Sequence, residues 1–535
     1  MPYLSNGIHL YLTLFSIHRG FMPLQDLLIK RARVTLLFLV VLSIIAVSVT
    51  PLVVMIATAT EPAPLVTFNK TFGGAASDEG WDVVQTNGGY IAVGFTGSFT
   101  SDYSRQVYIV KTDTMGNKVW EKTIGDSGND YGVTIKPTSD GGFVIAGWTD
   151  SYGRGDDVLL LKIDANGNKQ WSQAFGGSLE DRGMGVVQTT DGGYAVCGWT
   201  YSAGTADRAI WLLKTDSAGT MLWNKTFGGS DSDYGYGIVQ SSDGGLVLTG
   251  AVASSPTAGD RDVVLIKTDA NGNKVFYKTY GGAKSDYGQD VCATSDGGFF
   301  ITGWTWSSGA GDKDVYIIKT DAKGNEAWEK TFGGPYAEHG FSGRQTADGG
   351  YVITGDTIVA NATDYEQMYV VKTDAAGSLQ WNMTMGGAKC DIGYSIKQTS
   401  DGGYIIAGET HSYGAGSGDM YLVKLGSTPS TPAKSASSLT CAVSPSKVKV
   451  NSAFQIKGKL TSATGTPLTG QTIAVQKYGS NSWTNVTSAK TDGNGLYSVT
   501  LKSQSSGVYQ YRCVYGGSAT YLSATSKTVQ VTVVK

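Results

Sequence analysis

Two sets of residues recur along this chain at spacings that could gather carboxylates or aromatic rings around one ligand. The first set is acidic, and each member is followed two positions later by glycine. Its members are Asp78, Asp130, Asp181, Asp233, Asp286, Glu338 and Asp391. A ring of carboxylates offers Ca²⁺ the hard oxygen ligands that it prefers. A shared turn would also need such a residue, because Asp side chains hydrogen-bond turn backbone. We therefore expect a structural role, treat the aspartates as weak calcium candidates, and predict no other cofactor.

The second set changes in residue type from repeat to repeat. Each member directly follows a glycine near the end of a β-rich run. The members are Phe95, Trp148, Trp199, Ala251, Trp304, Asp356 and Glu409. Variation within a fixed frame is where ligand specificity tends to enter. Aromatic rings stack on the apolar face of a sugar, and carboxylates accept hydrogen bonds from its hydroxyls. We therefore predict that this set, apart from Ala251, binds a glycan or a partner protein. The alternative is that the tryptophans pack between repeats and the acids are only solvated.

Groups suited to catalysis are few in the part of the chain that follows residue 60. That part contains only two histidines, His339 and His411, which are too few for a histidine-based metal site. It has no Gly-x-Ser-x-Gly motif and no evident Cys/His nucleophile pair. A glycosidase pair of carboxylates stays open as an alternative, because such a pair is defined by its separation in space. We predict no catalytic residue and favour a protein that is not an enzyme.

A repeat of about fifty residues must position these side chains. Asn87-Gly88-Gly89 is followed by Asp-Gly-Gly at intervals of 51 to 53 residues, starting at Asp140, Asp191, Asp243, Asp296, Asp348 and Asp401. A period of this length is typical of a propeller or a solenoid. Residues 131–177 hold four β-rich runs separated by turn signals, which suits one four-stranded blade. The Asp-Gly turn predicts a type I′ hairpin, with positive φ at both central residues.

The two ends of the array indicate a closed ring. The run Phe68–Gly74 parallels Trp223–Gly229, which is the fourth-strand segment of a repeat, and the last unit ends near Leu425 without such a strand. An N-terminal strand that completes the seventh blade would leave no open sheet edge between the first and last units. We therefore predict an all-β fold with a seven-bladed β-propeller over residues 65–425.

The repeat resembles known propeller families. The segment Asp164–Trp171, D-A-N-G-N-K-Q-W, resembles quinoprotein-like propeller repeats, in which the tryptophan docks between neighbouring blades. The whole unit is similar to the exported propeller repeats common in methanogenic archaea. This resemblance implies an archaeal cell-surface scaffold. By fold analogy alone it also raises the alternative of a quinone-dependent dehydrogenase.

A second β-rich region follows the array. Residues 426–437 form a Pro/Ser/Thr-rich linker, and residues 438–535 hold short alternating runs broken by turns, as in a β-sandwich. The segment Thr491–Val499 resembles bacterial-type Ig-like domains. Cys441 and Cys513 lie in strand-like runs and could form a disulfide in an oxidising compartment. The alternative is two buried thiols.

The N-terminal region predicts export. Residues 34–60 are apolar and uncharged, long enough for a membrane-spanning helix, and they follow a basic end of the leader 1–33. The leader should stay in the cytoplasm and the remainder should lie outside the cell. Whether the helix is a cleaved signal or an anchor stays open, as does Met22 as an alternative start.

Charge and sequons agree with an exported protein. The net charge of −3 gives no general attraction to nucleic acid. Five sequons are candidate glycosylation sites: Asn69, Asn224, Asn361, Asn382 and Asn485. We expect a cell-surface or secreted protein for binding, adhesion or structure, with a glycan or surface protein as its partner. The alternative is a carbohydrate-active or quinone-dependent propeller enzyme.

Overall fold

A computed structural model describes residues 59, 61–100, 104–152, 155–204, 207–228, 231–253, 260–359, 366–427, 436–518 and 521–535. These residues form strands and no helix, so the described part of the chain is all-β. The predicted leader 1–33, the predicted helix 34–60 and the sequon at Asn361 fall wholly or largely outside these ranges. The described ranges contain no apolar helix of membrane-spanning length.

Seven four-stranded antiparallel sheets occupy the described residues from 66 to 425. The first three are β2 (Asp78–Thr86), β3 (Gly89–Thr96), β4 (Gln106–Thr112), β5 (Lys118–Ile124); β6 (Asp130–Pro137), β7 (Phe143–Thr149), β8 (Asp157–Ile163), β9 (Lys169–Phe175); and β10 (Asp181–Gln188), β11 (Tyr194–Thr200), β12 (Ala209–Thr215), β13 (Met221–Phe227). The next three are β14 (Tyr234–Gln240), β15 (Leu246–Ala253), β16 (Arg261–Thr268), β17 (Lys274–Tyr280); β18 (Asp286–Ala293), β19 (Phe299–Thr305), β20 (Asp314–Thr320), β21 (Glu326–Phe332); and β22 (Glu338–Gln345), β23 (Tyr351–Ile358), β24 (Glu366–Thr373), β25 (Leu379–Met385).

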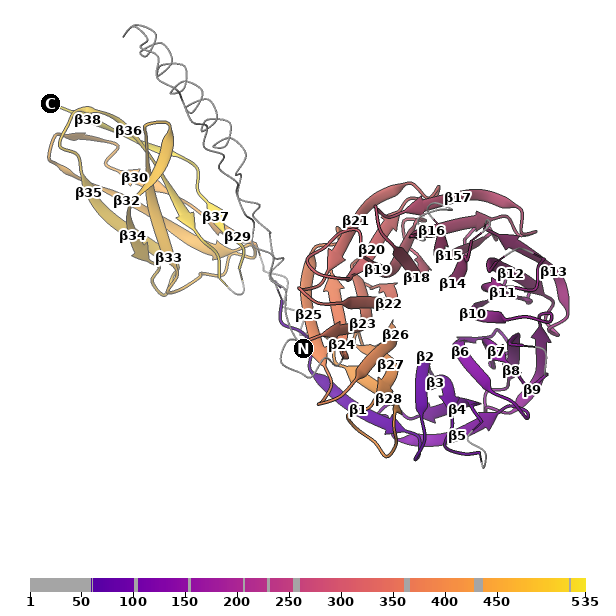
Figure 1. Cartoon of the computed structure of the whole chain (residues 1–535). Coiled ribbons are helices and arrows are strands. Elements are labelled where there is room, and N and C mark those ends of the chain that lie inside the picture. The colour runs from indigo at the N-terminus through magenta and orange to yellow at the C-terminus, as the bar shows by residue number, and fades with distance from the viewer. Residues whose placement is uncertain are drawn as a thin grey trace, which may run out of the picture. The chain divides into compact units, whose positions relative to one another are not determined.

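The last of these sheets joins both ends of the array. It consists of β26 (Asp391–Gln398), β27 (Tyr404–Thr410), β28 (Asp419–Leu425) and β1 (Val66–Phe72), and β1 pairs with β28 in antiparallel register, as the sequence predicted. Strand β2 contacts β26, β27 and β28, so the first sheet packs on the last. Figure 1 shows the sheets set around a ring with β2, β6, β10, β14, β18, β22 and β26 toward the centre, which is a propeller-like arrangement.

The Asp-Gly-Gly turns differ from the predicted type I′ hairpin. Gly141 has φ = 82°, but no aspartate of these turns has positive φ among the described residues. Thr138 N donates to Gly142 O and Gly141 N donates to Thr138 O, which makes a longer loop with a single left-handed glycine. The Asp140 side chain accepts from Gly142 N at 3.0 Å and helps to close the loop. The loop therefore has one left-handed residue, Gly141, and not the two that the prediction required.

Aromatic residues on the outer strands pack between neighbouring sheets. Trp120 of β5 lies over Gly167 in the next sheet, and a Cβ on that glycine would stand 2.6 Å from the indole. The same contact joins Trp171 to Gly219 and Trp223 to Gly272. The docking that the resemblance implied for the repeated tryptophan is therefore present at these sheets.

The C-terminal region contains two more sheets. One sheet consists of β29 (Ser437–Leu439), β30 (Ala442–Ser444), β32 (Ala453–Ser462) and β35 (Leu496–Lys502). The other consists of β31 (Lys447–Lys449), β33 (Thr472–Gly479), β34 (Ser482–Lys490), β36 (Gly507–Tyr515), β37 (Ala524–Thr525) and β38 (Val529–Val534). Phe454, Ile473 and Val531 are among the buried core residues that the two sheets share. The Cys441 and Cys513 thiols belong to this region, and their sulfurs lie 2.9 Å apart.

Candidate functional site

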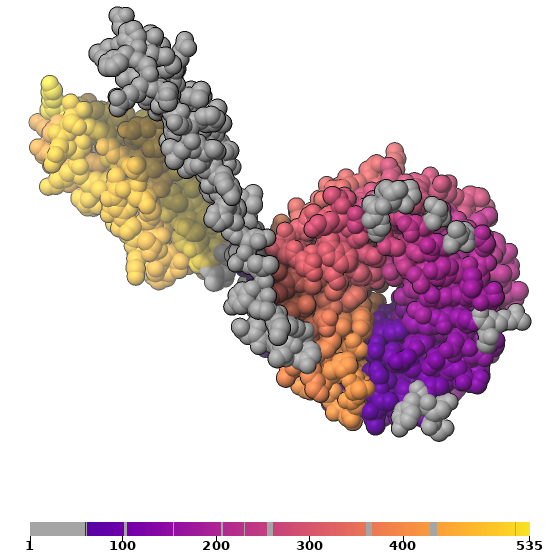
Figure 2. Space-filling model, viewed as in Figure 1, coloured from indigo at the N-terminus to yellow at the C-terminus, as the bar shows by residue number. Residues whose placement is uncertain are grey.

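A cavity of about 320 Å³ lies at the centre of the ring, where one strand from each of the seven sheets contributes to the lining. We call these strands, β2, β6, β10, β14, β18, β22 and β26, the inner strands. Each of them contributes lining residues, and Trp148 of β7 adds one side chain from a second strand. The space-filling view shows an opening at the centre of the ring on the face drawn (Figure 2).

A β-bulge in every inner strand determines which side chains reach the cavity. The register with the second strand shifts between Gly80 and Asp82 in β2, and the corresponding shift occurs in each of the other six inner strands. A bulge inserts one extra residue and breaks the strict alternation of faces. The consecutive residues Trp81 and Asp82 therefore both line the cavity.

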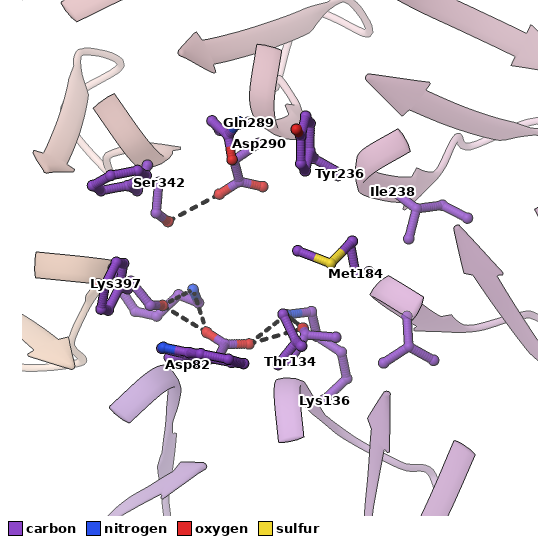
Figure 3. A pocket seen from close by; sticks show the side chains of 18 of the residues that line it. Asp82, Thr134, Lys136, Met184, Tyr236, Ile238, Gln289, Asp290, Ser342 and Lys397 are labelled. Carbon is purple, nitrogen blue, oxygen red and sulfur yellow. Dashed lines mark hydrogen bonds and ion pairs between the residues drawn. The ribbon is translucent and has the colours of Figure 1, made fainter. Parts of the chain in front are cut away.

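One side of the cavity is polar, and Asp82 is its most densely bonded member. Lys136 Nζ donates to its carboxylate at 2.9 Å from the following sheet, and Lys397 Nζ donates at 3.0 Å from the preceding sheet. The Thr134 and Ser395 hydroxyls donate at 3.0 and 2.6 Å (Figure 3). Although burial opposes its ionisation, the two ammonium groups and the Ser395 bond hold the pKa of Asp82 well below its usual value.

A second, smaller version of this arrangement surrounds Asp290. Its carboxylate accepts from Ser342 Oγ at 2.9 Å and from Arg344 Nη1, again from the following sheet. We call the two arrangements together the polar wall, and its residues are Asp82, Thr134, Lys136, Asp290, Ser342, Arg344, Ser395 and Lys397.

The opposite side of the cavity is apolar. Met184 and Ile238 lie across the cavity from Lys397 and Ser342 (Figure 3). Where the polar wall has carboxylates or hydroxyls, these two sheets have Gly185 and Gly237. A Cβ on Gly185 would come within 2.8 Å of the Tyr236 carbonyl oxygen, so the close approach of the backbones requires glycine there. The cavity is therefore charged on one side only.

The predicted glycan-binding residues lie at one end of this cavity. Each stands opposite an inner-strand residue in the register, as Trp148 does opposite Tyr131. Among the six, Trp148 alone lines the cavity, where it stacks on Trp81 with ring centroids 5.4 Å apart. Arg182 caps the other face of this group, 4.7 Å from the Trp148 ring centroid.

The other five predicted residues lie behind the cavity lining. Phe95 and Trp199 are buried, and Phe95 meets the edge of Trp81 with 5.3 Å between ring centroids. Trp304 is half-buried and stacks on Tyr287. The predicted set is thus brought to one end of the ring, but most of it supports the lining aromatic residues and does not itself line the cavity.

The two predicted acids are buried and partnered. Asp356 accepts from His339 Nδ1 at 2.8 Å, while Lys313 donates to the other nitrogen of that imidazole at 3.1 Å. Glu409 accepts from Tyr394 OH at 3.0 Å and interacts with the carboxyl of Glu79.

Glu79 is the lining acid at this end. Its Oε2 accepts from Trp81 Nε1 at 2.9 Å. Burial, and next the charge of Glu409, raise the pKa of Glu79 to about 8. Glu79 is therefore protonated at neutral pH and carries no charge into the cavity.

The weak calcium candidates bond to turns and hydroxyls. Asp78 accepts from Gly74 N at 2.7 Å and from Ser98 Oγ at 2.6 Å. The remaining candidates bond in related ways, and the bonds are from Asp126 N to Asp130, Gly177 N to Asp181, Ala253 N to Asp233, Gly282 N to Asp286 and Gly387 N to Asp391. Within the described ranges, no group of three or more His, Cys, Asp or Glu side chains is arranged to hold a metal ion.

Four of the five sequons lie on the described surface. Asn69, Asn224, Asn382 and Asn485 are all exposed. The first three occupy the same outer-strand position in different sheets, on β1, β13 and β25.

The sequence analysis missed the polar wall. Its residues vary between repeats as much as the predicted set does, with Asp82, Thr134 and Gly185 at one equivalent position. The same criterion of variation applied to the inner strands would have selected this position. The bulge hid it, because strict alternation would turn either Trp81 or Asp82 away from the cavity.

A second cavity of about 460 Å³ lies at the Asp-Gly-Gly end of the ring. It is lined by Arg344, Gln345, Thr346, Ala347, Lys397 and Gln398. Arg344 and Lys397 line both cavities and are therefore reached from either one.

No protein-family model and no curated protein matches this chain. Three similar solved structures are the extracellular domain of the putative one component system BT4673 from B. thetaiotaomicron, puromycin hydrolase and the plexin A4 extracellular region. Their identities are 10%, 10% and 7%, and their TM-scores 0.40, 0.40 and 0.39. They cover 89%, 75% and 88% of this chain, which spans only 59%, 62% and 62% of theirs. These values assign no family, and the resemblance to quinoprotein-like and archaeal repeats stays a prediction.

Proposed function

We propose that this chain is an exported binding protein, a seven-bladed β-propeller with a C-terminal Ig-like module, that holds a glycan in the central cavity. The observation that carries the proposal is the cavity itself, with aromatic side chains at one end and hydrogen-bonding groups along the polar wall. Pockets of roughly 300–1,000 Å³ that combine apolar walls with a few placed polar groups are typical ligand sites.

The chemistry of the lining suits a sugar. Trp81, Phe341 and Tyr394 contribute aromatic surface to the lining, and a pyranose ring presents a matching face of C–H groups. The Ser342 and Ser395 hydroxyls can exchange hydrogen bonds with sugar hydroxyls.

The arrangement of carboxyl groups supports binding over hydrolysis. Glycosidases hold two carboxyl groups at least about 5 Å apart, one of them free to act as acid. Of the interacting acids Glu79 and Glu409, only Glu79 lines the cavity, and Glu409 lies behind it, where it accepts from Tyr394 OH. Asp82 and Asp290 are each neutralised by cationic neighbours.

Export accounts for the other features of the chain. We place residues 1–33 in the cytoplasm, the helix 34–60 in the membrane or in a cleaved signal, and the propeller, the linker 426–437 and the Ig-like module outside. The four exposed sequons are compatible with glycosylation there. We further propose that Cys441 and Cys513 oxidise to a disulfide, which intact-mass measurement before and after reduction would detect.

A glycan-array screen of the purified full chain tests the proposal. We expect binding that Trp148→Ala weakens at least tenfold, because this ring lines the cavity. Trp223→Ala is the matched control, since Trp223 lies on the outer strand β13 and does not line the cavity, so its loss should leave affinity within a few-fold. Thermal melting of both variants checks that they fold. Absence of glycan binding, or equal losses in the two variants, would overturn the proposal in favour of a protein partner or a structural role.

A further inference from the structure

The polar wall carries an unbalanced charge. Its cationic side chains are Lys136, Arg344 and Lys397, and its carboxylates are Asp82 and Asp290. Among the lining residues, Glu79 is the remaining acid, and it is protonated at neutral pH because its pKa is about 8. One positive charge in the lining therefore has no counter-charge. A partly buried charge without a partner is costly, and proteins usually provide one.

The Arg344 guanidinium can donate further hydrogen bonds. Its Nη1 donates to Asp290 and, at 2.6 Å, to the Gly343 carbonyl oxygen. Within the described part of the chain, its Nε and Nη2 make no hydrogen bond. The planar guanidinium is the group best suited to hold a carboxylate through two parallel bonds.

Lys397 stands beside it in the same wall. Its ammonium donates to Asp82 and, at 2.7 Å, to Ser395 Oγ, which leaves a third N–H. Asp82 is already neutralised by Lys136 at 2.9 Å, so Lys397 is the cation in excess on this side.

The rest of the lining offers no competing charge. The side that faces Lys397 is formed by Met184, Ile238 and the two glycines Gly185 and Gly237. A ligand in this cavity can therefore place an apolar ring face on that side and its charged group on the polar wall.

We propose that the glycan is acidic, and that one sugar carboxylate binds between Arg344 and Lys397. The proposal rests on the proposed glycan-binding function and names the class of glycan. A single carboxylate balances the single excess charge, and a neutral sugar would leave that charge unpaired.

Lys397 also makes the binding sensitive to pH. Burial, opposed by Asp82 and Asp290 but reinforced by the cations Arg344 and Lys136, lowers the pKa of Lys397 to about 8. Affinity for an acidic glycan should thus fall as pH rises above about 8, by up to about tenfold per pH unit. Glu79 gains charge over the same range, and the Glu79→Gln variant removes that contribution while keeping the fall due to Lys397.

The test compares carboxylated glycans on the array with the methyl esters of the same glycans. We expect at least tenfold tighter binding of the free acids, and no displacement by sodium acetate at equal concentration, because the sugar body is also held. Binding of neutral and esterified glycans alone would overturn this inference and leave the proposed function standing. Displacement by acetate would reduce the site to a general anion site and also overturn it. Absence of any glycan binding would remove both proposals.

Variants locate the carboxylate. Arg344→Gln and Lys397→Gln should each weaken binding of the acidic glycan by at least tenfold and leave binding of its methyl ester unchanged. Lys397→Arg keeps the charge and should retain most of the affinity. That result would show that position 397 tolerates substitution and that the loss in Lys397→Gln comes from the missing charge. Arg105→Gln is the charge-matched control, since Arg105 bonds to Tyr131 OH and does not line the cavity. An equal loss in Arg105→Gln would show that long-range charge alone attracts the ligand, and would overturn the site.

Discussion

This chain pairs a lysine or arginine with an aspartate in two places, at the Asp-Gly-Gly turns and in the polar wall of the cavity. At the turns the pair is repeated almost unchanged in six sheets. The pairs are Lys162–Asp140, Lys214–Asp191, Lys267–Asp243, Lys319–Asp296, Lys372–Asp348 and Lys424–Asp401. In the cavity the pairing is made once around Asp82 and once around Asp290.

The two places bury opposite partners. At the turn, the lysine is buried and the carboxylate is exposed, as with Lys162 at 2% and Asp140 at 54% exposure. Lys162 also donates to the carbonyl oxygen of Ile163, so the pair closes one hairpin of its own sheet. In the cavity the carboxylate is buried, at 6% for Asp82, and its cations come from the two neighbouring sheets. The repeated pair thus stabilises a single sheet, whereas the unrepeated pair joins sheets and lines a binding cavity.

The largest expected difference at a fixed pH is between the free energies of unfolding of variants at the two places. Asp82→Asn leaves two cations without their shared carboxylate and should lower the free energy of unfolding by about 3 kcal/mol. Asp191→Asn removes an exposed carboxylate at a turn and should cost about 1 kcal/mol. Urea denaturation of the two variants measures both values. Equal losses would contradict the distinction between the two kinds of pair.

The next effect concerns the mouth of the cavity and depends on pH. Glu79 has a folded-state pKa of about 8 against an ordinary value of 4.5, so the folded protein retains a proton that the unfolded chain releases. Its contribution to stability therefore falls as pH rises from 4.5 to 8. Relative to the wild type, Glu79→Gln should gain up to about 1.4 kcal/mol per pH unit over this window.

Denaturation at pH 5 and pH 8 measures that gain, and a difference that does not grow with pH would contradict the raised pKa. The control is Glu121→Gln on outer strand β5, because the pKa of Glu121 is lowered and its substitution should give no such gain.

Two repeated glycines test how adjacent sheets of the scaffold are held together. Gly141 and Gly167 have nearly the same φ, 82° and 77°, but only Gly167 is covered by Trp120. Gly141→Ala should cost about 1 kcal/mol for its left-handed backbone alone. Gly167→Ala should cost about 2 kcal/mol or more, because its Cβ also displaces the indole. Equal melting temperatures in the two variants would show that the outer tryptophan does not hold adjacent sheets together.

The smallest expected effect for any single residue is the stability that a turn aspartate loses in acid. The Thr138 bond, opposed by burial and assisted by the Lys162 bond, lowers the pKa of Asp140 to about 2. Because the folded pKa is depressed, this stabilisation is present above about pH 4 and is lost as pH falls through 2. Thermal melting between pH 5 and pH 2 should show a gradual decline that is shallower in Asp243→Asn, since the Asp243 pKa is also about 2. An unchanged slope in that variant would contradict a stabilising role for the turn pairs.

The sequence predicted the propeller scaffold more completely than the candidate binding site. It placed the seven turns and the pairing of β1 with β28, because each depends on a short segment that recurs. It selected Trp148, which lines the cavity, but it did not anticipate that Phe95 and Trp199 would be buried in contact with Tyr131 and Tyr236 of the next inner strands. Their burial depends on the side chains of the next inner strand, which the spacing within one repeat does not describe.

Local sequence fixes where strands turn and how often, since the hairpin loops are closed by bonds between residues three or four positions apart. What the centre of the ring contains depends on packing between sheets that are far apart in sequence. Asp82 and Lys397 are 315 residues apart and meet because the last sheet packs against the first. The bulge then turns consecutive inner residues toward the same space. Ring closure and local backbone geometry together set the charge of the cavity, and both follow from packing among all seven sheets.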